Sequence, residues 1–118
     1  MSYSGPERRK TPRIPGKFVV SYRVKADIDN VDISQTRNLS LGGMILTTNK
    51  GFPIGTLLAL SLRLPFFVGT IGMTGRVQAT KEVAKDLIYD THIQFIAVDT
   101  KAEGIINDTI NYYLKEKK

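Results

Sequence analysis

Apolar and polar residues alternate along most of this chain, and such a period-two pattern predicts a protein built mainly of β-strands. The clearest run is 58–64, where four leucines alternate with smaller or polar residues until Pro65 ends the pattern. In an earlier run, Phe18, Val20 and Tyr22 share one face. The expected strands cover residues 18–24, 31–39, 44–48, 58–64, 70–83 and 87–98.

The hydrophobic period becomes helical at the end of the chain. Thr100 to Glu103 fits a capping box, in which the threonine hydroxyl accepts a hydrogen bond from a free amide and the glutamate reaches back. Apolar residues then recur at helical spacing, at Ile106, Ile110, Tyr113 and Leu114. The sequence therefore predicts one helix over about 100–115, stabilised by packing against the sheet.

The first residues differ from the rest of the chain. Residues 1–16 contain three prolines and two glycines, so we expect a flexible basic arm there. Residues 17–118 are expected to form one domain with a single core, which the 42% hydrophobic content allows. Strands at short spacing followed by one helix predict an all-β fold with one C-terminal α-helix, in the form of a small antiparallel barrel.

The charge balance favours anionic partners. The chain has 17 Lys+Arg against 11 Asp+Glu, which gives a net charge of +6. It has no cysteine, which excludes disulfides and thiolate metal sites and agrees with a cytoplasmic location. No apolar run approaches the roughly 20 residues of a membrane-spanning helix, and the N-terminus lacks the apolar region of a secretory signal.

Two short patterns carry candidate binding chemistry. Arg9 and Arg13 lie four residues apart in the arm, and guanidinium groups suit phosphate oxygens or the O6 and N7 of guanine. Asn38 and Ser40 offer donors and acceptors for a base edge or a phosphate, and Gly43 allows a sharp turn or a close approach. The layout predicts a cationic arm that encloses an anionic guanine dinucleotide against a polar rim.

At these residues the chain resembles the PilZ domain family, which binds the bacterial second messenger cyclic di-GMP. Arg9 and Arg13 match both arginines of the family's RxxxR motif, and Asn38, Ser40 and Gly43 match its [D/N]xSxxG motif. The resemblance covers nearly the whole chain. It implies a six-stranded antiparallel split β-barrel with a C-terminal helix and a ligand at the outer rim.

The residue before the first motif bears on the number of bound ligands. An arginine at this position, Arg8, resembles family members that bind a stacked pair of cyclic di-GMP molecules, so we count Arg8 among the ligand-binding residues. One departure from the family concerns His92, which stands where a glycine usually precedes a phenylalanine by three residues, here Phe95. His92 falls on the polar phase of its strand and is expected to be a surface residue.

The resemblance implies a non-enzymatic bacterial receptor that needs no cofactor beyond its ligand. Binding would order the arm and alter a contact with a protein effector, which the sequence does not identify. Two alternatives stay open: a basic barrel that binds single-stranded nucleic acid, and a PilZ-like adaptor without ligand binding. The nucleic-acid alternative is disfavoured because Phe18, Tyr22, Tyr89 and Phe95 fall on phases expected to be buried. No catalytic triad, metal cluster or phosphate-binding glycine loop supports an enzyme.

Overall fold

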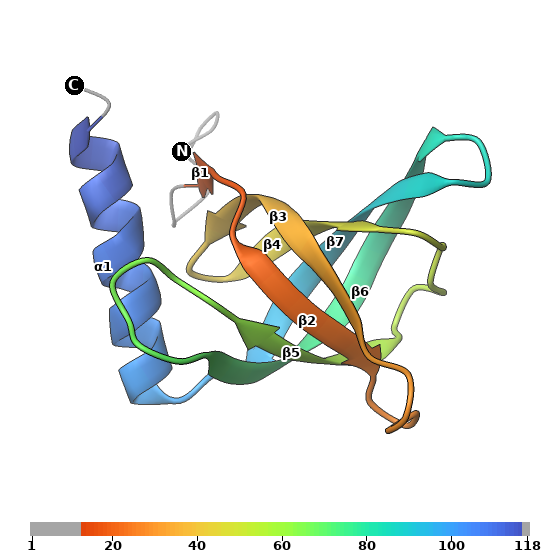
Figure 1. The fold of residues 1–118 in the computed structure, drawn as a ribbon, viewed down its shortest axis with the longest axis horizontal. Helices are drawn as coiled ribbons and strands as arrows, with labels where there is room; N and C mark the ends of the chain where they lie inside the picture. The colour runs from red at the N-terminus through yellow and green to blue at the C-terminus, as the bar shows by residue number, and fades with distance from the viewer. Residues whose placement is uncertain (1–12, 117–118) are drawn as a thin grey trace, which may run out of the picture.

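Seven β-strands and one α-helix form the part of the chain that the structure describes, residues 13–116, in a computed structural model (Figure 1). The strands are β1 (Arg13–Pro15), β2 (Val19–Val24), β3 (Asp32–Ser40), β4 (Gly43–Thr48), β5 (Leu57–Leu62), β6 (Ile71–Ala84) and β7 (Ile88–Ala97), and the helix is α1 (Thr100–Glu116). The six strands expected from the alternation are all present, with boundaries shifted by one or two residues.

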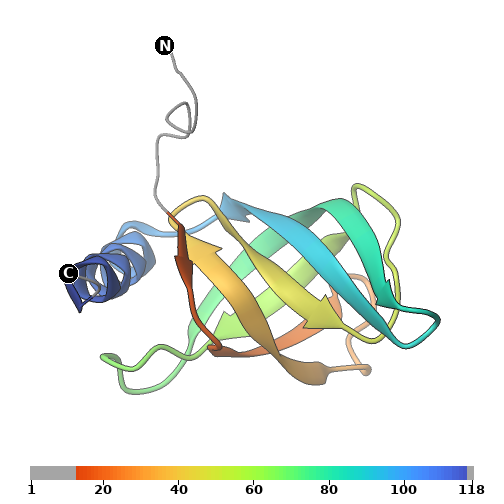
Figure 2. The ribbon, with the colours of Figure 1, turned by 90° about the horizontal axis from the view of Figure 1, so that it is seen from above.

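The strands form one antiparallel sheet that closes on itself. Their hydrogen-bonded order is β1-β3-β2-β5-β6-β7-β4, and a further pairing of β3 with β4 joins the ends, so β2 to β7 close a six-stranded barrel. The short strand β1 is added beside the end of β3. Figure 2 shows α1 at one end of the barrel. The expected fold class is therefore confirmed.

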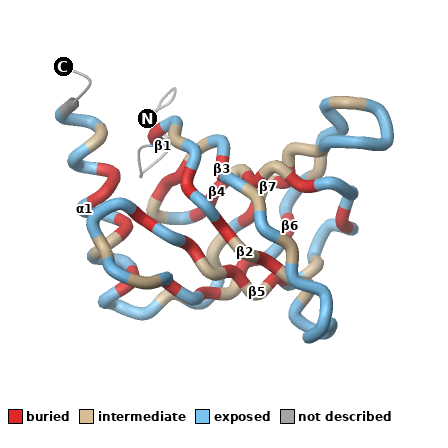
Figure 3. Tube along the Cα trace, in the orientation of Figure 1, coloured by how far each residue is buried: buried red, intermediate tan, exposed pale blue. Residues whose placement is uncertain are grey.

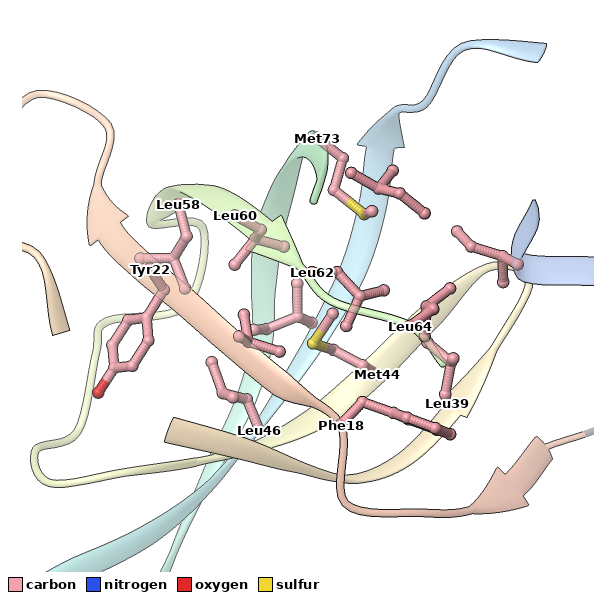
Figure 4. Packing of buried hydrophobic residues seen from close by; sticks show 14 of the residues in the cluster. Phe18, Tyr22, Leu39, Met44, Leu46, Leu58, Leu60, Leu62, Leu64 and Met73 are labelled. Carbon is pink, nitrogen blue, oxygen red and sulfur yellow. The ribbon is translucent and has the colours of Figure 1, made fainter. Parts of the chain in front are cut away.

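The inward phase of the strands fills the barrel with apolar side chains. Val20, Leu58 and Leu62 are completely buried, while their neighbours along each strand are exposed or half-buried (Figures 3 and 4). Burial of a side chain of this size stabilises the fold by about 1.5–3 kcal/mol relative to leaving it in water. The alternation read from the sequence thus identifies the core face correctly.

Tyr22 lies at one end of this core. Its ring packs edge-on against Phe52, with ring centroids 6.3 Å apart. Burial raises the pKa of the Tyr22 hydroxyl above its usual value, and the negative charge of Asp32 raises it further. A backbone hydrogen bond at Asn49 acts in the opposite direction.

Helix α1 covers the barrel end through the apolar stripe that the sequence predicts. Ile106 and Ile110 are buried, and Tyr113 packs edge-on against Phe18 with ring centroids 5.6 Å apart. Leu114 was expected on the same stripe but is 39% exposed, because it lies at the edge of the stripe that the buried Ala102, Ile106, Thr109 and Ile110 define.

The helix is capped one residue earlier than the sequence suggests. The amide of Ala102 donates to Asp99 Oδ1 at 2.8 Å, and the amide of Glu103 donates to the carbonyl oxygen of Asp99 at 3.0 Å. Asp99 is therefore the N-cap in place of Thr100. A carboxylate caps as well as a hydroxyl, and its charge also interacts favourably with the positive end of the helix dipole.

The structure places Arg13–Pro15 in a strand, although a flexible arm was expected through residue 16. Ile14 is 2% exposed and belongs to the core cluster, so its burial fixes this segment beside β3. The flanking prolines hid the strand from sequence reasoning, yet proline is tolerated in an edge strand. Arg8 and Arg9 belong to residues 1–12, which lie outside the described residues.

Candidate functional site

The polar residues of the second motif lie at a barrel rim where β1, β3, β4 and β7 meet. Along Asn38–Ser40, β3 has β1 on one side and β4 on the other, and β4 in turn pairs with β7. Arg13 lies opposite Ser40, and its Nη1 donates a hydrogen bond to Asn38 Oδ1 at 2.8 Å. The rim therefore brings a guanidinium group and a carboxamide side by side.

A β-bulge in β3 determines which residues face outwards at this rim. The pairing with β4 shifts between Thr36, which lies opposite Leu46, and Asn38, which lies opposite Ile45. Thr36 is buried, whereas Arg37 is exposed and Asn38 is half-buried. The extra residue thus presents two polar side chains in succession on the outer surface.

Arg37 and Asp90 form an ion pair that the sequence did not reveal. Arg37 Nη1 lies 3.3 Å from Asp90 Oδ1, with side-chain exposures of 54% and 19%. The residues are far apart in the chain, and only the position of Arg37 next to the motif asparagine could have pointed to it. The pair leaves one carboxylate close to a rim that is otherwise cationic.

Ser40 and Gly43 shape the turn between β3 and β4. The Ser40 hydroxyl accepts a hydrogen bond from the Gly43 amide and donates one to the Gly43 carbonyl oxygen, each at 3.2 Å. Ser40 is 3% exposed, so its hydroxyl serves the turn in this conformation. A Cβ atom at Gly43 would collide with the backbone carbonyl oxygen of Ile93 on β7, so only glycine allows β4 to lie this close.

A surface hollow of about 330 Å³ lies over these strands. The residues that line it include Arg13, Arg37, Asn38, Asp90 and the half-buried Ile45. Two guanidinium groups against one carboxylate give the hollow a positive balance. It combines charged donors, an amide edge and an apolar surface, which are the features that a nucleotide needs.

The structure brings four of the six expected site residues together, namely Arg13, Asn38, Ser40 and Gly43. Arg8 and Arg9 fall among residues 1–12, which the structure does not describe. His92 lies on the outward phase of β7, as expected, and pairs with Ile45 on β4. It therefore sits two strands from Asn38 in the same cross-strand row.

Within residues 13–116, no three His, Cys, Asp or Glu side chains gather in a way that could hold a metal ion. In the same part of the chain, no helix has both the length and the apolar character needed to cross a bilayer.

A comparison of the whole chain with known protein families identifies its family. Residues 7–112 match the model described as the PilZ domain. The chain belongs to the PilZ domain family. The resemblance to this family inferred from the sequence is thereby confirmed.

Solved structures share the PilZ fold of this chain. The Bacillus subtilis inhibitor of motility, MotI/DgrA, has a TM-score of 0.75 and 18% identity, covering 93% of this chain and 51% of its own. The PilZ domain of YcgR from Escherichia coli, solved with c-di-GMP, has a TM-score of 0.71 and 17% identity, covering 93% and 94%. The MrkH–c-di-GMP complex from K. pneumonia has a TM-score of 0.68 and 18% identity, covering 94% and 56%.

This PilZ chain thus spans about half the length of the inhibitor of motility and of MrkH, and most of the YcgR domain. At such low identities the likeness establishes the fold. No curated protein sequence matches the chain.

Proposed function

We propose that this PilZ chain is a non-enzymatic receptor for cyclic di-GMP. The observation that carries the proposal is the contact of the Arg13 guanidinium with the Asn38 carboxamide at the edge of the 330 Å³ hollow. Two of the structures that share its fold were solved with this messenger. A cytoplasmic location belongs to the same proposal.

Each rim residue has a role that its position supports. Arg13 would form charge-assisted hydrogen bonds with a phosphate or a guanine, and Asn38 would read a base edge once it exchanges its bond with Arg13. Ser40 and Gly43 would hold the turn, and the Ser40 hydroxyl would contact the ligand only if it left its partners in Gly43. Arg8 and Arg9 would supply further guanidinium groups and favour a stacked pair of messengers.

The messenger is proposed to act by closing the basic arm over the rim and changing a contact with a protein effector. Because β1 is already part of the sheet, the closing segment would be the one that precedes it. Ordering of that segment stays a prediction, since residues 1–12 are not among those described.

Burial disfavours the nucleic-acid alternative for two of the four aromatic residues on which it depends. Phe18 and Tyr22 are 6% and 3% exposed, and neither can stack on a base without leaving the core. Tyr89 and Phe95, which were also expected to be buried, are only half-buried, because they lie towards the two ends of β7. An adaptor without ligand binding would still have this fold, so the decisive measurement is the binding of the messenger itself.

Isothermal titration calorimetry with cyclic di-GMP tests the proposal. A charge-assisted hydrogen bond contributes about 1.5–3 kcal/mol, so Arg13→Ala should weaken binding by roughly 10-fold to 150-fold. The same substitution removes one exposed side chain and should change the melting temperature little. Lys85→Ala, at the far β6–β7 hairpin, is the control for loss of one positive charge.

A molar ratio near two would support the stacked pair. Unchanged affinity in Arg13→Ala would remove Arg13 from the site, and no heat signal from the unmodified protein at high messenger concentration would refute the receptor proposal.

A further inference from the structure

A second concave surface lies away from the rim, between the link from β1 to β2, the loop from β5 to β6, and α1. This groove has a volume of about 600 Å³ and shares no lining residue with the rim hollow. Its walls include Phe18, Leu64, Phe67 and Tyr113, and Lys17 and Arg63 also line it. Figure 1 shows the β5–β6 loop passing beside α1.

The two cations of the groove are available to a partner. Within residues 13–116, neither the Lys17 nor the Arg63 side chain makes a hydrogen bond or an ion pair with the protein, and both are exposed. The Arg63 amide donates to the Val19 carbonyl oxygen at 2.9 Å, which places both cationic residues on neighbouring strand ends.

The sheet beside the groove adds to the positive charge. The outward positions of β2, β5 and the first half of β6 carry small or apolar residues and two further arginines, Arg23 and Arg76, but no carboxylate. An acidic partner therefore meets no opposing negative charge from these strand positions.

Aromatic and apolar residues also lie beside the groove. Phe66 contacts Tyr112 with ring centroids 4.7 Å apart, and Tyr112 contacts Tyr113 at 5.5 Å. Phe66 is 55% exposed and Val68 is 97% exposed. Aromatic residues and arginine contribute most of the binding energy at protein interfaces, and a contiguous exposed apolar patch is typical of a binding surface.

We propose that this groove docks an acidic segment of a partner protein, which inserts one large apolar side chain between Phe67 and Tyr113 while its carboxylates pair with Lys17 and Arg63. The concave shape favours a peptide over a bilayer surface, which cannot fill a hollow. The rings of the aromatic series pack edge-on against one another, which favours an inserted aliphatic or aromatic side chain over stacked nucleic-acid bases.

The hydroxyl of the buried Thr36 connects the groove with the barrel rim. Thr36 Oγ1 donates to the Gly16 carbonyl oxygen at 2.6 Å and accepts from the Phe18 amide at 3.0 Å. Thr36 lies on β3 two residues before Asn38, so it joins the rim to the Phe18 wall of the groove. A messenger that moves β1 would therefore change the groove, and this second part of the proposal rests on the proposed function.

Selection from a library of random peptides of about 12 residues, displayed on phage, identifies the chemistry that the groove prefers. The unmodified protein is the target, and the double variant Arg63→Glu/Val68→Asp serves for counter-selection. Enriched peptides should carry at least two acidic residues around a Phe, Leu or Trp. Failure to enrich any sequence, or enrichment of basic peptides, would overturn the proposal.

Fluorescence anisotropy with an enriched peptide then locates its site. Arg63→Glu should weaken binding at least tenfold, whereas Lys85→Glu, which changes the net charge equally at the far hairpin, should change it less than twofold. Two competitors are then added: a DNA duplex of about 20 base pairs, and vesicles with about one third phosphatidylserine. If either competitor displaced the peptide, and if Arg63→Glu abolished the binding of that competitor, the surface would instead be one for nucleic acid or membrane.

Repeating the titration with cyclic di-GMP separates the two proposals. The messenger should change peptide affinity at least fivefold, and Arg13→Ala should remove that change while leaving peptide binding without messenger intact. If calorimetry shows that the messenger binds but the peptide affinity is the same with and without it, the coupling is refuted. Peptide binding by a protein that does not bind the messenger would refute the receptor proposal and leave the groove standing.

Discussion

Adjacent glycines at the rim allow a direct test of why the second motif needs glycine at its last position. Gly43→Ala would place a methyl group against the Ile93 carbonyl oxygen, the Ile93 carbonyl carbon at 3.3 Å and Gln94 Cα at 3.4 Å. All three atoms belong to the backbone of β7, so none of them can move aside by rotating a side chain. At Gly42, by contrast, an added methyl group meets nothing within 4 Å.

The expected loss of stability follows from the shift that the methyl group imposes. A carbon–oxygen contact needs about 3.3 Å, so β4 must move away from β7 by roughly 1 Å. Such overpacking costs about 1–3 kcal/mol. The shift also weakens the neighbouring hydrogen bond from the Phe95 amide to the Gly42 carbonyl oxygen, at 2.9 Å, and a bond of this kind contributes about 0.5–1.5 kcal/mol. We expect Gly43→Ala to lower the free energy of unfolding by about 2–4 kcal/mol.

Urea denaturation followed by circular dichroism measures this loss, and a thermal scan should show a fall of roughly 8–15 °C. Gly42→Ala is the matched control and should change the free energy of unfolding by less than about 1 kcal/mol, in either direction. If Gly43→Ala were as stable as Gly42→Ala, the packing of β4 against β7 would not explain the glycine. Its role would then have to lie in contact with the ligand.

Three further predictions concern single side chains. Ser40→Ala should lower the free energy of unfolding by about 1–3 kcal/mol, measured in urea, because it leaves the buried amide and carbonyl of Gly43 without their partner; an unchanged midpoint would contradict this. Because folding raises the pKa of Tyr22, the unfolded chain loses its tyrosine proton first, and the free energy of unfolding should fall as the pH rises beyond 10.0. In urea titrations between about pH 9 and 11, Tyr22→Phe should show a smaller fall. An equal dependence of the free energy of unfolding on pH in both proteins would refute this. Asp90→Asn should strengthen binding of cyclic di-GMP several-fold by calorimetry, because it frees Arg37 and removes a negative charge from the rim, whereas weaker binding would show that the Arg37–Asp90 pair positions the site.

The barrel could be predicted because the sequence pattern within each strand is enough to identify that strand. Each strand has one buried face, so the period-two pattern, as in Leu58, Leu60 and Leu62, determines both the strand and its inward side. The helix followed from the spacing of Ile106 and Ile110 for the same reason.

The features that the sequence did not predict are those in which the conformation or partner of a residue depends on distant parts of the chain. Asp99 and Thr100 are both good caps, and only the path of the chain leaving β7 decides between them. The short strand β1 exists because Ile14 finds space in the core beside β3, which no local pattern around two prolines could show. The Arg37–Asp90 pair likewise requires the bulge in β3 and the neighbouring strands.

These observations divide the rim motifs into two physical classes. Ser40 and Gly43 are buried and bonded within the turn, so the fold itself requires them whether or not a ligand binds. Arg13 is exposed and Asn38 half-buried, and the hydrogen bond between them lies at the surface, where such a bond contributes little to the stability of the fold. A PilZ chain could therefore lose its arginine and asparagine and keep its barrel, whereas loss of the serine or glycine would affect stability first. This chain retains both classes, and the outward pair is the part of the motif on which a binding assay should concentrate.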